Sequence, residues 1–122
     1  MIKFTLKGST PSKKNSKNII YAKGCMMVIP SKKHNDWHEE QMWVMKSLKI
    51  PLQTKPVSIT MTFFADSKRR GDLDNKASSV LDLLKDAGVL EDDDWFHVPK
   101  VILNFGGVCP QSPRCEIELT EL

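Results

Sequence analysis

The sequence contains no run of about eighteen apolar residues, the length that a helix needs to span a bilayer. Its first residues, MIKFTLKG, lack the charged start, apolar middle and small-residue cleavage site of a secretion signal. We therefore expect no membrane association and a cytoplasmic location. With 122 residues, 40% of them hydrophobic, the chain suffices for one compact domain over 1–122 and is too short for two.

Cysteine is also scarce. The three cysteines, Cys25, Cys109 and Cys115, lie far apart and form no CxxC pair. This pattern supports neither a disulfide framework nor a zinc knuckle. We interpret all three as reduced thiols.

Acidic residues are absent from the first 33 positions, which contain eight lysines. A segment whose charges are all positive is suited to binding a polyanion, and nucleic acid is the common polyanion. The alternative is a lysine-rich surface that only keeps the protein soluble. If the partner is nucleic acid, the candidates for phosphate contacts in the whole chain are Lys13, Lys14, Asn15, Lys17, Arg69 and Arg70.

The stretch 69–76, RRGDLDNK, and the later stretch 91–94, EDDD, concentrate the acidic side chains. Carboxylates crowded into a small volume repel one another unless a cation neutralises them. Carboxylate oxygens suit Mg²⁺, with Mn²⁺ as a substitute ion. An aspartate that caps a helix needs no metal, but capping does not account for Asp72, Asp74 and a second acidic cluster together.

Alternation of apolar and polar residues predicts strands, the clearest of them at 57–64. A hairpin is expected over 18–29, with its turn near Lys23 and Gly24. The remaining strands are expected at 2–6, 98–105 and 115–119.

Two amphipathic helices separate these strands. The first is expected from a cap at Ser31 to about residue 49, with Trp37, Val44 and Leu48 on one face and Gln41 and Met45 beside them. The second carries apolar residues over 77–87, with Asp72 or Asp74 as its cap and Gly88 at its end. The order of elements predicts an α+β fold, in which two helices pack on a mixed or antiparallel sheet.

Other readings of the motifs are weaker. His34 and His38 have the spacing of metal ligands on a helix, and His97 is the one available third ligand for zinc. A calcium loop of the EF-hand type fails because Ala77 stands where that loop requires glycine. A protein-interaction module would expose the methionines and tryptophans that we otherwise assign to the core, namely Met26, Met27, Trp37, Met42, Trp43 and Met45.

Several motifs together resemble the signature of the RusA family of Holliday junction resolvases. They are RGDLDN at 70–75, LDLL at 81–84, AGV at 87–89 and the acid pair Asp92 and Asp93. The early PSKKNS at 11–16 is similar to the N-terminal motif of that family. These segments cover most of the chain.

The resemblance implies a small homodimeric endonuclease that binds four-way DNA junctions and makes paired nicks with magnesium, encoded by a bacterium or phage. Asp72, Asp74 and Asp93 match the catalytic, metal-binding carboxylates of the family, and Asp92 is a neighbour. The family has a catalytic lysine four residues beyond the second aspartate, where this chain has Ser78. Lys76 is our candidate for that role.

Two alternatives remain open from the sequence. Lys100 is a second candidate base in place of Lys76. A non-catalytic protein that binds branched DNA would have the same basic segments, with the aspartates serving as caps and solvated turns.

Overall fold

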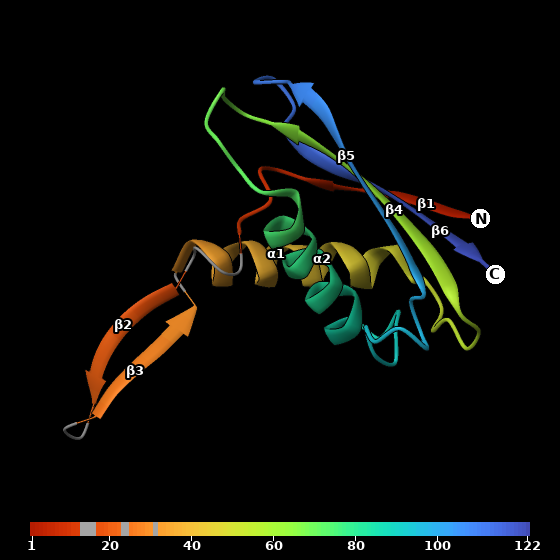
Figure 1. Ribbon diagram of the computed structural model, residues 1–122, viewed down its shortest axis with the longest axis horizontal. Helices are drawn as coiled ribbons and strands as arrows, with labels where there is room; N and C mark the ends of the chain where they lie inside the picture. Colours follow the sequence, from red (N-terminus) through yellow and green to blue (C-terminus); the bar gives the residue numbers. More distant parts are fainter. Residues whose placement is uncertain (13–16, 23–24, 31) are drawn as a thin grey trace.

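The computed structural model describes residues 1–12, 17–22, 25–30 and 32–122, and the side chains discussed below lie in 1–12 and 32–122. Figure 1 shows a twisted four-stranded sheet with two helices beside it and a separate strand pair. The strands are β1 (Ile2–Lys7), β2 (Lys17–Ala22), β3 (Cys25–Pro30), β4 (Val57–Ala65), β5 (Lys100–Val108) and β6 (Arg114–Glu121). The helices are α1 (Lys32–Leu48) and α2 (Leu73–Asp86).

The main sheet has the strand order β1-β6-β4-β5. β6 is antiparallel to both of its neighbours, whereas β4 and β5 are parallel. A parallel pair requires a crossover connection, and α2 lies in it. The predicted α+β class, with two helices packed on a mixed sheet, is confirmed.

One face of the sheet forms the core. Alternate residues of β4, from Val57 to Phe63, are buried, as the alternation in the sequence predicts. They pack with Ile117 and Leu119 of β6 and with the inner sides of both helices. The apolar residues that α2 contributes to this core are Ala77, Val80, Leu83 and Leu84.

The buried face of α1 differs from our prediction. Its buried residues are His34, Trp37, Gln41 and Met45, which follow one another at helical spacing, whereas Leu48 is exposed. The prediction of Trp37 on this face, with Gln41 and Met45 beside it, is confirmed, but the prediction was wrong for Leu48 and did not include His34. Gln41 is buried since its side-chain amide donates to the backbone carbonyl of Lys7 at 3.0 Å, which ties α1 to the end of β1.

The antiparallel pairing of β2 with β3 confirms the predicted hairpin, and its turn at Lys23 and Gly24 lies outside the described residues. So does the predicted cap at Ser31. Neither described helix is both long and apolar enough to cross a membrane.

Candidate active site

The site begins where β4 ends. After Ala65 the chain leaves the sheet in a polar loop, 66–72, and enters α2 at Leu73. This loop, the segment 9–12 that follows β1, and the first turns of α2 surround a pocket of about 520 Å³. Its charged lining residues are Lys33, Asp66, Arg69, Arg70, Asp72, Lys76 and Arg114.

Asp72 occupies the N-cap position of α2, with an extended backbone, but its carboxylate caps no backbone amide. That carboxylate instead accepts a hydrogen bond from the side-chain amide of Asn75 at 3.3 Å. Asp74 follows in the first helical turn, and both aspartates are exposed. The partial positive charge at a helix N-terminus stabilises anions there. Capping therefore does not explain the Asp72 carboxylate, which lies at the pocket with Asp74 two residues further on.

Lys76 forms part of the pocket wall. Its ammonium donates to the carbonyl of Thr10 at 2.8 Å, and burial is the main cause that lowers its pKa. The nearby charge of Lys33 lowers the pKa further, and Asp66 opposes this. Gly71 leaves room for this placement, because a Cβ at that position would lie 2.9 Å from Cε of Lys76 and would make the end of that side chain shift.

The segment that follows β1 is fixed to α2 by a second contact. The hydroxyl of Ser79, which is fully buried, donates to the carbonyl of Pro11 at 2.7 Å. The segment 9–12, which leads into Lys13 and Lys14, is thereby held beside the aspartates. Lys13, Lys14 and Asn15 themselves lie outside the described residues.

The other predicted phosphate contacts divide in two groups. Arg69 and Arg70 are exposed and line the pocket together with Asp72. Lys17 begins β2, for which only the backbone is described.

Three pocket residues were missed by the sequence analysis. Lys33 lies in the lysine-rich segment but was not selected. Arg114 follows no motif, and its guanidinium stacks 3.8 Å from the ring centre of Phe64. Asp66 has a lowered pKa, chiefly because of the neighbouring side chain of Ser9 and, more weakly, the charge of Lys33.

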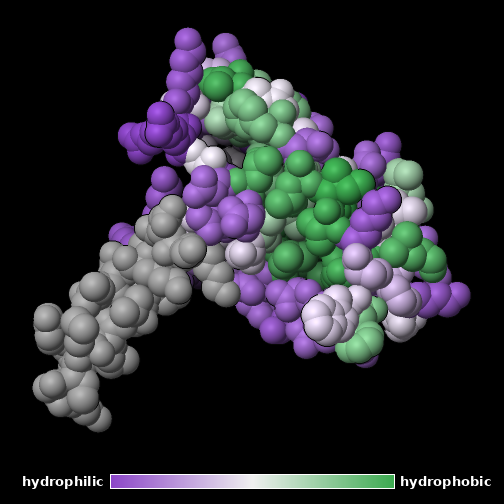
Figure 2. Space-filling view, in the orientation of Figure 1, coloured by the Kyte–Doolittle hydropathy of each residue, from purple (hydrophilic) through white to green (hydrophobic). Residues whose placement is uncertain are grey.

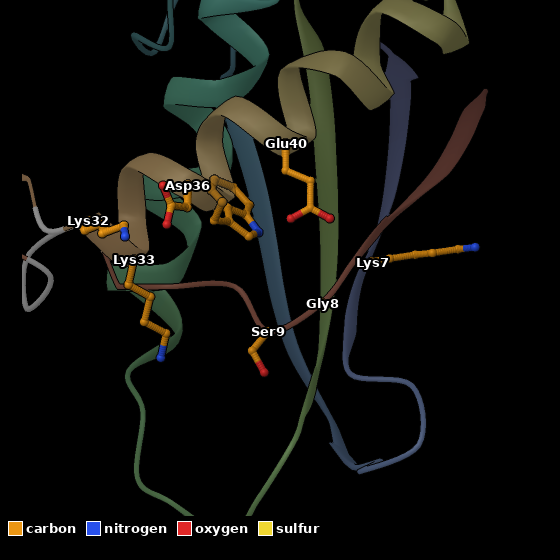
Figure 3. Close-up of a pocket in the computed structure, with 8 residues that line it drawn as sticks. Lys7, Gly8, Ser9, Lys32, Lys33, Asp36 and Glu40 are labelled. Carbon is orange, nitrogen blue, oxygen red and sulfur yellow. The ribbon is translucent and has the colours of Figure 1, made fainter.

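A second hollow, of about 610 Å³, shares Ser9 and Lys33 with this pocket. Figure 3 shows Lys32 and Lys33 extending from the start of α1, with Ser9 on the neighbouring chain segment. Lys7 also lines it, although its side chain extends away from the others in Figure 3. Asp36 and Glu40 also line this hollow, so the basic surface continues from the pocket only as far as Lys32 and Lys33 at the N-terminal end of α1.

Asp93 lies elsewhere. The ammonium of Lys85 pairs with Asp92 at 3.8 Å, which holds the acidic loop at the C-terminal end of α2. A helix of 14 residues is about 21 Å long, so this loop and Asp72 lie at opposite ends of α2 (Figure 1). Within one copy of the chain, Asp72 and Asp74 lie two residues apart, and Asp93 does not join them.

The structure also gives the positions of Lys100, the alternative candidate base, and of Ser78, which stands where the family has a lysine. Lys100 begins β5, which runs parallel to β4, so it lies at the end of the sheet away from the 66–72 loop. Ser78 is exposed, and its hydroxyl donates to the backbone carbonyl of Asp74 at 3.1 Å.

The three histidines do not form the predicted alternative zinc site. His38 pairs with Asp86 at 2.9 Å, whereas His97 contacts Asp94 at 2.6 Å and Glu91 at 3.4 Å. In the part of the chain that the structure describes, no three His, Cys, Asp or Glu side chains are placed to hold a metal ion together. Contact with Asp94, followed by weaker contact with Glu91, raises the pKa of His97.

Comparisons with known proteins give a family for the chain. No curated protein matches the chain. The family model described as "Endodeoxyribonuclease RusA" matches residues 9–120, a span that contains the pocket, both helices, β4 and β5 in full and all of β6 but its last residue. The chain therefore belongs to the RusA family of endodeoxyribonucleases, which resolve Holliday junctions.

Proposed function

We propose that this chain is a Mg²⁺-dependent endonuclease that binds four-way DNA junctions and resolves them by paired symmetric nicks. The observation that carries the proposal is the pair of exposed carboxylates at the start of α2, Asp72 and Asp74, of which Asp72 lines a pocket together with Arg69, Arg70 and Lys33. Acidic groups for a metal and basic groups for phosphate thus lie in one place. Membership of the family supports the activity as a nuclease on branched DNA.

The residues present fit a hard divalent cation. Asp72 and Asp74 offer carboxylate oxygens, the ligands that Mg²⁺ prefers and for which Mn²⁺ also competes. When bound, such an ion activates water and stabilises the charge that develops on the phosphate. Neither aspartate side chain has an ion pair within the described residues, since the Asp72 carboxylate accepts only a neutral amide. The pair is therefore suited to a ligand that carries positive charge.

The basic residues have separate roles in this proposal. Arg69 and Arg70 orient backbone phosphates, because guanidinium groups donate in pairs to phosphate oxygens. Lys76 fixes the 9–12 segment by its bond to Thr10, and its half-buried charge at the pocket wall stabilises negative charge on the scissile phosphate.

Paired nicks require two sites, and a symmetric dimer supplies them. Because Asp93 lies at the far end of α2, it can complete a site with Asp72 and Asp74 only from a second copy. In the proposed homodimer, Asp93 of the partner subunit is the third carboxylate of each site.

The test is cleavage of a labelled synthetic four-way junction with Mg²⁺, together with a gel-shift measurement of binding. Asp74→Asn should lower the cleavage rate at least about 100-fold, the scale of losing one group that stabilises the transition state. Junction binding should be kept. Glu39→Gln, which removes an exposed carboxylate of α1, is the matched control and should cleave normally. Equal cleavage by Asp74→Asn and the unmodified protein would contradict the assignment of the site.

A second candidate function is binding of branched DNA without cleavage. Ser78 favours it, because a neutral hydroxyl that donates to the Asp74 carbonyl occupies the position of the family's catalytic lysine. Junction binding by the unmodified protein, with no nicks in Mg²⁺ or Mn²⁺, would support this candidate.

A further inference from the structure

Arg114 is a basic residue of the pocket to which the proposed function gives no role. It is the first residue of β6 and lies opposite Phe64 of β4 in the sheet. Both residues line the pocket that contains Asp72. Asp72 belongs to the helix side of this pocket, at the N-cap of α2, whereas Arg114 belongs to its sheet side. A DNA strand whose scissile phosphate lies near Asp72 would therefore also meet a cation on the sheet side.

Several contacts fix the guanidinium of Arg114. Its Cζ atom lies 3.8 Å from the ring centre of Phe64. Nε donates to a carboxylate oxygen of Glu116 at 2.9 Å, and Nη1 donates to the Ser112 carbonyl at 2.9 Å and lies 3.7 Å from the sulfur of Cys109. An arginine loses conformational entropy when it binds a ligand, and these contacts already restrict the side chain. The guanidinium is therefore held in one orientation before a ligand arrives.

The ring of Phe64 is fixed in turn by the neighbouring strand. A Cβ at Gly106 of β5 would lie 2.6 Å from two atoms of that ring, so a larger residue would displace the ring. The register between β4 and β5 also shifts between Phe63 and Phe64. Such irregularities redirect side chains next to active sites. The local structure thus favours one position of the ring, and the ring supports the guanidinium.

Part of the guanidinium stays available. Its second terminal nitrogen, Nη2, has two N–H groups that no contact within the described residues uses, and 24% of the side chain is exposed. Figure 2 shows hydrophilic side chains over the loop 66–72, which supplies Arg69 and Arg70 to the same pocket. Planar guanidinium donors match phosphate oxygens, and a basic surface attracts a polyanion. The unused donors therefore suit a phosphate of the DNA backbone.

We propose that Arg114 binds, through Nη2, a backbone phosphate of the cleaved strand other than the scissile one. The inference rests on the proposed function, in which Asp72 and Asp74 serve the scissile phosphate with a metal ion. Arg114 holds the same strand from the sheet side of the pocket and so orients the scissile bond. Its contacts to Phe64 and Glu116 set its position before DNA binds, which lowers the entropic cost of binding.

The experiment measures junction binding by fluorescence anisotropy in EDTA, which prevents cleavage. Each junction of a series has one neutral methylphosphonate, at a different position of the cleaved strand. Arg114→Gln should bind the unmodified junction about 10-fold more weakly, the scale of one hydrogen bond to a charged group. One non-scissile methylphosphonate should weaken binding by the unmodified protein to a similar extent and should not weaken binding by Arg114→Gln. A role of Arg114 in stability alone would not produce this dependence on one phosphate.

Lys3→Gln is the matched control. Lys3 also pairs with a glutamate of β6, Glu118 at 3.5 Å, but it does not line the pocket. This variant should bind every junction of the series as the unmodified protein does.

Phe64→Leu tests the support of the guanidinium and keeps its charge. It should lose part of the affinity that Arg114→Gln loses. The double variant should bind no more weakly than Arg114→Gln alone, because both changes act on one contact.

Equal methylphosphonate effects in the unmodified protein and in Arg114→Gln at every position would overturn the inference. A difference confined to the scissile phosphate would also overturn it. Circular dichroism checks folding, and if Arg114→Gln does not fold, the same comparison is made with Arg114→Lys, which keeps the charge but loses the planar donors. A junction bound with the expected dependence on Arg114 but never nicked would refute the proposed function alone, whereas nicking without that dependence would refute this inference alone.

Discussion

The pocket differs from the sequence pattern of its family at two single residues, Lys76 and Ser78. Lys76 lies two residues beyond Asp74, and its ammonium is held by the Thr10 carbonyl. Ser78, four residues beyond Asp74, lies on the exposed side of the first turns of α2. The two positions differ by about 200° around a helix, so a lysine at one does not reach the place of a lysine at the other.

Restoring the missing lysine tests this difference. Ser78→Lys should raise the rate of junction cleavage, by about 10-fold or more, because a second ammonium near Asp74 stabilises the charge of the transition state. The measurement is single-turnover cleavage with Mg²⁺. Ser78→Gln is the control for side-chain length and should bring no gain, and equal gains in both variants would argue against an electrostatic effect.

Another residue-scale prediction concerns pH. Because the pKa of His97 is raised, chiefly by Asp94, its protonated form is favoured in the folded loop. The stabilisation is fully present below the ordinary histidine pKa of about 6.5 and is lost as pH rises through the higher folded value. An NMR titration should give a pKa for His97 above that ordinary value, and Asp94→Asn should lower it. An unchanged pKa in Asp94→Asn would contradict the assigned cause.

At the scale of elements, α2 connects the sheet to the site. Its buried side joins the core, its first residue follows Asp72, and its last turn pairs with the acidic loop. The position of the carboxylates thus depends on the packing of this one helix.

Loss of core packing should therefore affect stability and not only activity. Leu84→Ala, at a fully buried position, should lower the free energy of unfolding by about 2–5 kcal/mol. Leu52→Ala, at a 43% exposed position, should change it by less than about 0.5 kcal/mol. Urea denaturation measures both, and similar losses in the two variants would show that α2 is not packed as described.

Elements with one buried face were predictable from the sequence. The alternation from Val57 to Phe63 and the stripe from Ala77 to Leu84 each correspond to a buried face. The face of α1 was predictable only in part, because Trp37, Gln41 and Met45 are buried as expected, whereas the hydrogen bond of Gln41 to the carbonyl of Lys7, 34 residues away, is not visible in the sequence. The resemblance to the family directed attention to Asp72 and Asp74, but the place of Asp93 depends on the path of the chain beyond α2. Arg114 enters the pocket through the pairing of β4 with β6, which no local pattern reveals.

Across the whole molecule, basic and acidic residues gather in different places. The net charge is +3, yet basic groups gather around the pocket, and the acidic loop lies at the other end of α2. A junction would therefore meet the molecule at its basic end, since steering follows the local field.

This distribution predicts how salt affects binding. The logarithm of the junction affinity should fall linearly with the logarithm of salt concentration, and Arg70→Ala should make that slope shallower by about 1, the effect of one lost phosphate contact. Lys55→Ala is the matched control, because Lys55 pairs with Glu121 away from the pocket. Fluorescence anisotropy at several salt concentrations measures the slopes, and an equal change in both variants would show that Arg70 does not contact phosphate.

The pairing of β1 with β6 has a consequence for synthesis of the protein. Ile2 is opposite Leu119, so β1 leaves the ribosome well before β6, the strand with which it pairs, and residues 1 and 122 lie at the same side of the sheet (Figure 1). During translation β1 must wait, unpaired and with its apolar residues exposed, until 114–121 has emerged. The pairing of β1 therefore forms only after β6 has been synthesised, and a translation product that stops before residue 114 would lack the partner of β1.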